Sequence, residues 1–463
     1  MNNPPNRVQG IYLSPLLKYE RGRIIYRVSN PESPSPSENK GKIYFSILPY
    51  KLKAIILFFK DILKKEQLME RSEERILTTH VGSLARSEEL LNLLSEKELD
   101  KEIDESRFGK LALAETIEVV KRQEDCGIDI GGNGEIPRLG FSIYAKNRMR
   151  GFGGHSNRGT VTDFVKFPEY AAFLAKRAGI DTITESATTW SMPECVSAVE
   201  YDLTQSKEEL DMFEEALKKN RESFSETFIT AATPGILSTT LYRSEDNPDY
   251  LNDEQYVYAL AEELRKEYEL IVSRGHTLQL DAPDLALEKQ IMFLNKPLEE
   301  FLSRCELHID AMNKALVNIP REKVRLHVCW GNWEGPHADD IDLEPLLPLL
   351  YRANVGGLSM AFANPRHSHE IELFKKYRPP KDMLLFPGCI DVTYNYLEHP
   401  QVVANRILDF VEVIGERERV IASTDCGFST FAGYVMVAND VAWAKLKALS
   451  EGAKIASSEL WSN

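Results

Sequence analysis

The chain has 463 residues, enough for one large domain or two ordinary domains with a substantial buried core. Its formal net charge of -15 argues against a nucleic-acid partner, because phosphate binding needs clustered Lys and Arg. Six cysteines are too few for a disulfide framework, so we expect a reducing, cytoplasmic environment and small-molecule ligands.

The first 68 residues differ in charge from the rest of the chain. They contain 12 Lys or Arg and 5 Asp or Glu, a net charge of about +7, which leaves about -22 for the remainder. Residues 30–41 have the Pro- and Ser-rich composition of a disordered linker. The apolar stretch 43–63 is interrupted by Pro49 and four charged residues, so a short surface helix is favoured over a membrane span. We predict a basic, partly disordered N-terminal extension at 1–68 and a catalytic domain at 69–463.

Beyond residue 69, short apolar or β-branched runs alternate with longer amphipathic stretches. The runs predicted as strands are Ile76–Ser83, Ile128–Asn133, Thr227–Leu237, Thr277–Asp281, Val324–Cys329, Gly357–Phe362, Met383–Ile390 and Val420–Thr424. The clearest helical stretches are Lys110–Asp125, Glu254–Arg274, Leu298–Val317, Pro400–Ile414 and Val435–Ser450. Eight strands that alternate with helices predict an α/β fold, a (β/α)8 TIM barrel.

The interval from residue 136 to 226 is too long for a plain connection between a strand and the next helix. We therefore predict an elaborated insertion between the second and third strands. It is expected to hold a helix, a lid-like excursion with a hairpin around Thr182–Trp190, and a mobile turn at Gly151–Gly154.

In a TIM barrel the active site lies at the carboxyl ends of the strands. Three residues at these ends have metal-ligand chemistry, namely His327, Cys329 and Cys426. Because alternate residues of a strand share a face, His327 and Cys329 point to the same side. Two thiolates and one imidazole suit tetrahedral Zn²⁺ with one position left open. Small buried cysteines in a packed core are the alternative interpretation.

Five strand-end segments resemble, in the same order, motifs of the catalytic barrel of cobalamin-independent methionine synthase. They are Ile76–Leu84, Asn133–Glu135, Leu278–Asp281, Leu326–Cys329 and Ser423–Gly427. The resemblance runs from about residue 75 to 450 and matches the single-barrel members of that superfamily. Segments His327–His337 and Ala363–His367 look more like the epoxyalkane:coenzyme M transferases, which are also single-barrel members.

The resemblance assigns roles to individual residues. It implies zinc ligands at His327, Cys329 and Cys426, and substrate contacts at Gly82, Ser83, Glu135 and Asp281. A pair of carboxylates suits an ammonium group, as in homocysteine, and would repel the sulfonate of coenzyme M. The alternative for Glu135 and Asp281 is a structural hydrogen bond at the end of a strand.

The zinc motif departs from the family at Ala361. The family places a glutamate ligand there, in a Leu-Ser-Phe-Glu motif, and alanine cannot bind a metal. The fourth position is then filled by water or by a neighbour such as His367, His369 or Glu370, or the metal is held more weakly.

A second departure is Thr393, which stands where methionine synthase has a histidine that is thought to protonate the leaving folate. This substitution weakens the case for methyl-folate as the donor. Asp391 remains as a candidate catalytic acid, and His80 and His337 are further candidates.

The sequence therefore predicts a zinc-dependent S-methyltransferase of the 5-methyltetrahydropteroyltriglutamate-homocysteine type. It would activate a homocysteine-like thiol as a zinc thiolate and form a methyl thioether. The expected partners are a small thiol and a methyl or alkyl donor, with a corrinoid protein as one candidate, and neither nucleic acid nor a membrane. The alternatives are epoxyalkane:coenzyme M transferase or other thiol alkyltransferase activity, a corrinoid- or porphyrin-binding relative, and a catalytically lapsed barrel.

Overall fold

The computed structural model describes residues 18–20, 23–25, 69–99, 101–156, 158–178, 192–220, 224–431 and 436–462. By their internal contacts, the residues form two units, Met1–Ile62 and Leu63–Asn463. In the first unit, β1 (Lys18–Glu20) pairs antiparallel with β2 (Arg23–Ile25). The predicted linker at 30–41 and the apolar stretch at 43–63 lie outside the described residues. Among the residues that are described, no helix is long and apolar enough to cross a membrane.

The second unit is built on an eight-stranded sheet. Its strands are β3 (Leu77–Thr78), β4 (Ile130–Gly132), β7 (Glu226–Ala232), β8 (Thr277–Asp281), β9 (Val324–Val328), β10 (Gly357–Met360), β11 (Leu384–Ile390) and β12 (Ile421–Thr424). Each strand pairs in parallel with its neighbours, in the order β3-β12-β11-β10-β9-β8-β7-β4. A parallel bridge between Thr79 and Ile130 joins the two ends of this order, so the sheet closes into a barrel.

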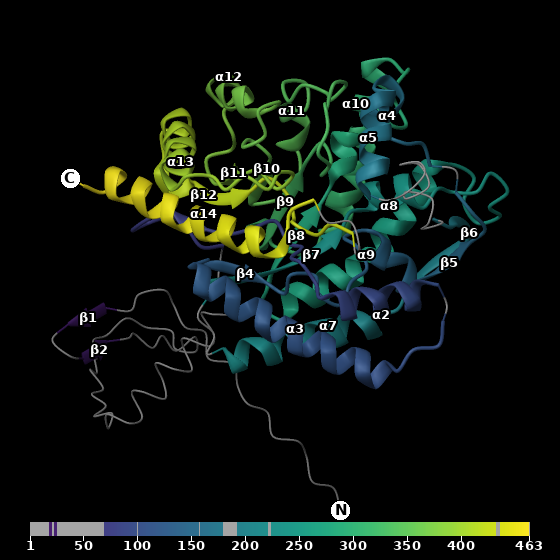
Figure 1. The fold of residues 1–463 in the computed structure, drawn as a ribbon, viewed down its shortest axis with the longest axis horizontal. Helices are drawn as coiled ribbons and strands as arrows, with labels where there is room; N and C mark the ends of the chain where they lie inside the picture. The colour runs from purple at the N-terminus through teal and green to yellow at the C-terminus, as the bar shows by residue number, and fades with distance from the viewer. Residues whose placement is uncertain are drawn as a thin grey trace, which may run out of the picture. The chain divides into compact units, whose positions relative to one another are not determined.

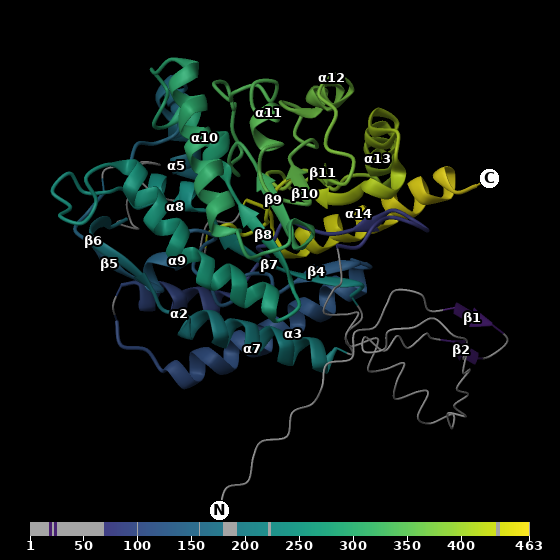
Figure 2. The ribbon, with the colours of Figure 1, turned by 180° about the vertical axis from the view of Figure 1, so that it is seen from behind.

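Helices surround the sheet (Figures 1 and 2). Those between and after the barrel strands are α2 (Glu88–Glu98), α3 (Glu105–Cys126), α7 (Thr204–Lys219), α8 (Pro234–Thr240), α9 (Asp253–Ser273), α10 (Leu298–Ala315), α11 (Leu347–Leu350), α12 (Leu373–Lys376), α13 (Pro400–Ile414) and α14 (Asn439–Leu460). Capping residues close in sequence determine where several of these helices begin and end. Asp104 caps the start of α3 through the Arg107 amide, and Gly127 ends it in a left-handed conformation. The predicted TIM barrel is confirmed.

The insertion between β4 and β7 holds a 3-10 turn (Ile143–Asn147), β5 (Met149–Gly153), α4 (Thr162–Lys166), α5 (Pro168–Ala178), β6 (Glu194–Tyr201) and α7. β5 and β6 pair antiparallel. The prediction of a mobile turn at Gly151–Gly154 is wrong, because Gly151 to Gly153 belong to β5. Gly151 has φ +105°, and a Cβ on it would lie 2.6 Å from the Ala198 carbonyl oxygen, so glycine here permits close strand pairing. The predicted hairpin at Thr182–Trp190 lies outside the described residues.

Several predicted elements have different bounds in the structure, among them one strand and one helix. The strand predicted at Thr227–Leu237 ends at Ala232, because the Thr233 side chain caps the Ile236 amide and Pro234 begins α8. The helix predicted at Val435–Ser450 begins at Asn439 and continues to Leu460. Sequence periodicity located both elements, whereas the cap at Thr233 decided where the strand gives way to α8.

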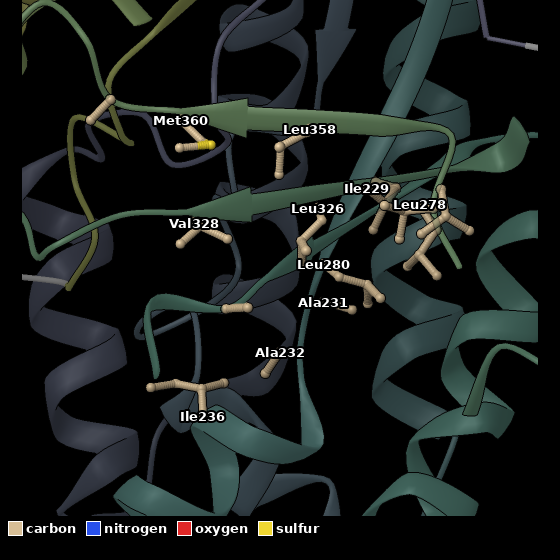
Figure 3. Packing of buried hydrophobic residues seen from close by; sticks show 14 of the residues in the cluster. Ile229, Ala231, Ala232, Ile236, Leu278, Leu280, Leu326, Val328, Leu358 and Met360 are labelled. Carbon is tan, nitrogen blue, oxygen red and sulfur yellow. The ribbon is translucent and has the colours of Figure 1, made fainter. Parts of the chain in front are cut away.

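Alternation along the strands separates the two faces of the barrel wall. Leu326 and Val328 of β9 join the core between sheet and helices, as do Leu278 and Leu280 of β8 (Figure 3). Residues of the other parity face the barrel interior, where a separate apolar cluster closes the end at which the strands begin. That cluster contains Met69, Leu77, Ile130, Phe228, Leu384, Phe386 and Ile421.

A polar layer lies next to this apolar cluster in the barrel interior. Arg325 of β9 packs over the Phe228 ring, 3.7 Å from its centroid, and donates to Gln279 Oε1 at 2.8 Å. Gln279 Nε2 in turn donates to Asp281 Oδ1 at 2.8 Å. Because alternate residues of a strand share a face, Asp281 lies next to Gln279 on the interior face of β8. In the same way, His327 lies next to Arg325 on the interior face of β9.

Candidate metal centre

Three potential metal ligands converge at the carboxyl ends of the strands. His327 belongs to β9, Cys329 follows it directly, and Cys426 lies two residues beyond β12. One ligand atom from each residue lies within 4.8 Å of the other two. β9 and β12 are separated in the sheet by β10 and β11, so the group forms across the barrel mouth. The structure brings together the three residues that the sequence singled out.

The chemistry of these residues fits a metal ion. His327 is 2% exposed, and neither of its ring nitrogens has a hydrogen-bond partner among the residues that the structure describes. Burial of a polar nitrogen without a partner is costly, and coordination removes that cost. A hydrogen bond from Cys426 lowers the pKa of the Cys329 thiol well below its usual value. The same hydrogen bond raises the pKa of the Cys426 thiol, so without a metal the pair favours a thiolate at Cys329 only. Cysteine binds metals as a thiolate.

Two buried carboxylates lie beside the three ligands. Asp281 of β8 pairs in register with His327, and burial raises the pKa of Asp281 to about 7. Glu135 follows β4 and has φ +56°, a left-handed conformation that is unusual for a residue with a side chain. Burial also raises the pKa of Glu135, and its Oε2 atom has no hydrogen-bond partner. Both residues are therefore buried acids with raised pKa values, and their role as substrate contacts stays a prediction.

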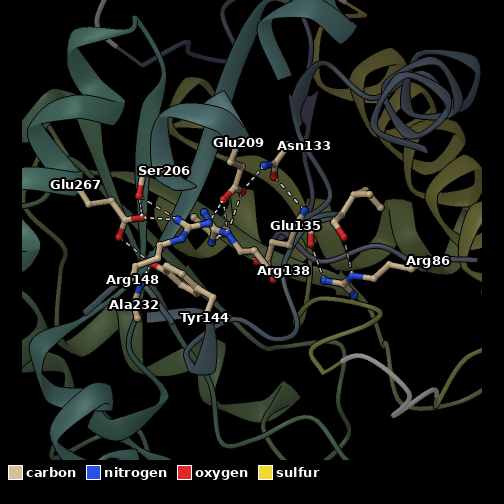
Figure 4. A network of polar contacts seen from close by, with 12 residues as sticks. Arg86, Asn133, Glu135, Arg138, Tyr144, Arg148, Ser206, Glu209, Ala232 and Glu267 are labelled. Atoms are coloured by element: carbon tan, nitrogen blue, oxygen red, sulfur yellow. Dashed lines mark hydrogen bonds and ion pairs between the residues drawn. The ribbon is translucent and has the colours of Figure 1, made fainter. Parts of the chain in front are cut away.

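Glu135 is held by a buried polar network that includes Glu209 of α7 (Figure 4). Thr230 Oγ1 donates to Glu135 Oε1 at 2.9 Å and accepts from Arg138 at 2.9 Å, and Arg138 pairs with Glu209. On the other side, Glu209 accepts from Asn133 Nδ2 at 2.6 Å, and Asn133 Oδ1 accepts from the Glu135 amide at 3.0 Å. One carboxylate on a helix therefore supports both the side chain and the backbone of Glu135.

Three further buried charged residues, Arg86, Arg138 and Glu209, were not predicted from the sequence. Arg86 donates to the carbonyl oxygens of Glu135 at 2.6 Å and Ser429 at 3.1 Å, so it joins the segments that follow β4 and β12. Charged residues are usually exposed, which is why these were passed over. A usable signal was present, since Arg86 and Arg138 each follow a predicted site residue by three positions.

Gly82 and Ser83 lie between the carboxylate and the Cys426 segment. A Cβ on Gly82 would come within 2.7 Å of Glu135 Oε1, and Gly82 has φ +152°, so glycine permits this close approach. Ser83 contacts Gly427, whose added Cβ would lie 2.0 Å from Ser83 Oγ. The Ser83 carbonyl also accepts from the Phe428 amide at 2.9 Å. Both predicted residues therefore adjoin the other site residues.

Asp391 lies at the end of β11 and is 1% exposed. Its Oδ1 atom accepts from the amide and the hydroxyl of Thr393 at 2.8 and 2.7 Å, while Oδ2 has no partner. The backbone of Asp391 is fixed by a buried ion pair, because its carbonyl accepts from Lys445 and its amide donates to Glu398. Asp391 thus presents one unbonded carboxyl oxygen on a rigid backbone.

His80 and His337, the other two candidate acids, are both engaged in contacts. His80 Nε2 bonds to Gln123 Oε1 at 2.8 Å, and burial lowers the pKa of His80 to about 4. A neutral imidazole at pH 7 is a poor proton donor. His337 bonds to Asp340 and to the Trp333 carbonyl. The catalytic role of His80 stays a prediction.

The proposed substitutes for the missing fourth ligand lie elsewhere. His367 bonds to Asp340 and Glu370 at 2.8 Å each, and His369 is exposed, so none of His367, His369 and Glu370 belongs to the ligand group. Ala361 follows β10, in which Ser359 pairs with His327. Alternation then places Ala361 on the interior face at the level of Cys329.

Comparisons with known proteins support the resemblance found in the sequence. No protein-family model matches the chain. The chain is 25% identical over 386 residues to methionine synthase from Thermococcus kodakarensis, which covers 83% of this chain and 94% of that protein. It is 29% identical over 177 residues to 2-hydroxypropyl-CoM lyase from Xanthobacter autotrophicus, which covers 33% of this chain and 45% of that protein. That second match spans less than half the length of the relative.

The fold also resembles solved methionine synthase barrels. A B12-independent methionine synthase from a Shewanella species, solved in complex with selenomethionine, superposes with a TM-score of 0.62 at 18% identity, covering 84% of this chain and 100% of the other. A putative vitamin-B12 independent methionine synthase from Listeria monocytogenes gives a TM-score of 0.56 at 17% identity, covering 84% and 99%. These structures support the TIM-barrel fold, and the sequence relatives confirm the resemblance to methionine synthase and 2-hydroxypropyl-CoM lyase.

Proposed function

We propose that this chain, which resembles the single-barrel methionine synthases, is a zinc-dependent S-methyltransferase with a small amino thiol of the homocysteine type as acceptor. The observation that carries the proposal is the convergence of His327, Cys329 and Cys426 at the barrel mouth. One imidazole and two thiolates suit tetrahedral Zn²⁺ and leave a fourth position open.

The three side chains would hold the zinc ion. The acceptor thiol would supply the nucleophilic sulfur, and the residues around it would position it. A free thiol has a pKa of about 8.5, and zinc, when bound, would lower it so that the acceptor sulfur reacts as a thiolate at neutral pH. Transfer forms a carbon–sulfur bond and breaks the bond between the alkyl carbon and its donor. The residues at the barrel mouth therefore need to align the acceptor sulfur, the alkyl carbon and the donor atom.

Acidic residues at the mouth favour an acceptor with a positive charge. Glu135 offers an unbonded Oε2 atom, and Asp281 stands beside His327. An ammonium group placed between these carboxylates would compensate both buried acids. Gly82 and Ser83 border this region through their backbone, so they are suited to contact the rest of the acceptor.

Asp391 is our candidate for the proton donor to the leaving group. Its Oδ2 atom is buried without a partner, and the backbone is fixed by Lys445 and Glu398. Thr393, which stands at the position of the family histidine, bonds to the other oxygen of Asp391. The methyl donor is therefore either a compound with a methyl group on nitrogen or one with a methyl group on cobalt, which a corrinoid protein would supply.

A second candidate is the alkylation of coenzyme M or its cleavage from an adduct, on the same metal chemistry. The match to 2-hydroxypropyl-CoM lyase favours it. Glu135 and Asp281 argue against it, since two carboxylates near the acceptor would repel a sulfonate.

The experiment is zinc quantification of the purified full-length chain, followed by an acceptor screen. Homocysteine and coenzyme M would each be offered methyl-folate, methylcobalamin and an epoxide. We expect about one zinc per chain and methylation of homocysteine by one of the methyl donors. Coenzyme M adduct formation would favour the second candidate, and zinc without alkylation of either thiol would favour a catalytically lapsed barrel.

A further inference from the structure

A hydrogen bond across the barrel mouth joins the two segments that carry the cysteine ligands. Asn332, three residues beyond Cys329, donates from Nδ2 to the Gly427 carbonyl oxygen at 2.7 Å and to Thr430 Oγ1 at 2.8 Å. Gly427 directly follows Cys426. Since β10 and β11 separate β9 from β12 in the sheet, the strand ladder itself does not hold these two segments together.

The chain turns sharply beyond Cys329, which brings Asn332 into this position. Gly331 has φ +108°, and a Cβ on it would lie 1.9 Å from the Trp333 ring, so only glycine permits the turn. The Trp333 indole then donates to Asp163 of α4 at 3.2 Å. Asn332 is thus fixed between a glycine turn and an anchored tryptophan.

The Cys426 segment is held on the other side by several contacts. The Cys426 carbonyl accepts from Thr424 Oγ1 at 2.8 Å. Gly427 is pressed against Ser83, where there is no room for a Cβ. The contacts with Thr424 and Ser83 therefore fix the backbone at Gly427. The hydrogen bond from Asn332 ties the segment that carries Cys329 to this fixed backbone.

We propose that Asn332 is a positioning residue that sets the separation of the Cys329 and Cys426 sulfurs, and thereby the affinity and geometry of the metal centre. The proposal rests on the proposed function, because it assumes that these sulfurs bind one ion. Outer contacts that orient ligands commonly change metal affinity by about 10- to 100-fold when they are removed. Asn332 touches neither sulfur directly through the contacts described here, so its effect would run through the backbone.

The test compares Asn332→Ala with wild type in zinc affinity, measured by chelator competition, and in the absorption spectrum of the Co²⁺-loaded full-length protein. We expect the zinc dissociation constant of Asn332→Ala to rise at least about tenfold. The cobalt bands that report tetrahedral thiolate coordination should shift or weaken. The matched control is Asn220→Ala. Asn220 is also half-buried and donates two bonds from Nδ2, to Ile117 and Ala216 at 3.0 Å, but it ends α7 near the start of β7.

The outcomes separate this inference from the proposed function. If wild type binds zinc and folded Asn332→Ala binds it equally with an unchanged cobalt spectrum, the inference is overturned and the proposed function stands. If wild type binds no zinc, both are overturned. Should Asn332→Ala fail to fold, Thr430→Val decides. It removes one of the two acceptors, so a smaller loss of affinity supports the inference and unchanged affinity overturns it.

Discussion

Asp281 and His327 stand side by side across β8 and β9, paired in register on the interior face of the barrel. A buried carboxylate therefore lies next to the imidazole of the ligand group, and Glu135 adds a second carboxylate to the same mouth. Under the proposed function, this juxtaposition would combine a site for sulfur with a site for a positive charge. It would then favour an amino thiol over an anionic thiol as acceptor.

The first prediction concerns acceptor selectivity. Glu135→Gln keeps the shape of the side chain and removes its charge, so the KM for homocysteine should rise about tenfold or more, while zinc content stays at the wild-type level. Steady-state kinetics with homocysteine and coenzyme M provide the measurement. Unchanged preference between the two thiols in Glu135→Gln would argue against ammonium recognition at this residue.

The second prediction concerns the cysteine ligands. Cys329→Ser should lose both stoichiometric zinc and turnover, because a serine hydroxyl is a far weaker ligand for zinc than a thiolate. Cys126→Ser is the control, since Cys126 is half-buried and bonds to the Trp443 carbonyl, away from the ligand group. Metal analysis and activity of the two variants are compared. Full activity of zinc-free Cys329→Ser would contradict the mechanism.

The third prediction restores a ligand. Ala361 lies two residues beyond Ser359, which pairs with His327, so we expect Ala361→Glu to bring a carboxylate to the open position and to tighten zinc binding. Chelator competition measures the change. Ala361→Gln has nearly the same size without the charge and should tighten binding less. Equal affinities for wild type and Ala361→Glu would mean that this position does not face the ion.

The fourth prediction concerns the pH dependence of stability. Although burial opposes it, Arg138 and Arg148 lower the pKa of Glu209 from 4.5 to about 2. A carboxyl with a depressed folded pKa stabilises the fold above its unfolded pKa, and this stabilisation is lost as the pH falls toward the folded value. Glu209→Gln leaves buried arginine charge uncompensated and should lower the free energy of unfolding by about 3–5 kcal/mol at pH 7.

Urea unfolding at several pH values measures this difference. The gap between wild type and Glu209→Gln should be widest above about pH 4.5 and should close toward pH 2. Glu208→Gln is a suitable control, because Glu208 is the exposed neighbour of Glu209 on α7. A gap that stays constant from pH 7 to pH 3 would show that the charge of Glu209 does not stabilise the fold.

Much of the fold and the metal ligands could be predicted from local patterns. Alternation in β9 puts His327 and Cys329 on one face, and the carboxyl ends of parallel strands meet at one side of the barrel, where Cys426 also arrives. Strand periodicity and barrel geometry were enough to single out these residues as candidate ligands, and the family resemblance implied zinc. Long-range contacts between side chains are not needed to find these residues.

The supporting contacts could not be predicted in this way. The bond between Asn332 and Gly427 joins residues 95 positions apart, and the pair Arg138 and Glu209 joins residues 71 apart. Such long-range pairs depend on tertiary packing, which no local pattern encodes. The mobile turn predicted at Gly151–Gly154 was wrong for a related reason, because a glycine such as Gly151 is compatible both with a turn and with a close approach between strands.

The central claim is that His327, Cys329 and Cys426 share one metal ion. X-ray absorption at the zinc edge of the purified full-length protein tests it most directly. The account predicts about one zinc per chain with two sulfur ligands near 2.3 Å and at least one nitrogen or oxygen ligand near 2.0–2.1 Å. Stoichiometric zinc without sulfur in its coordination sphere, or no bound zinc after reconstitution, would contradict it.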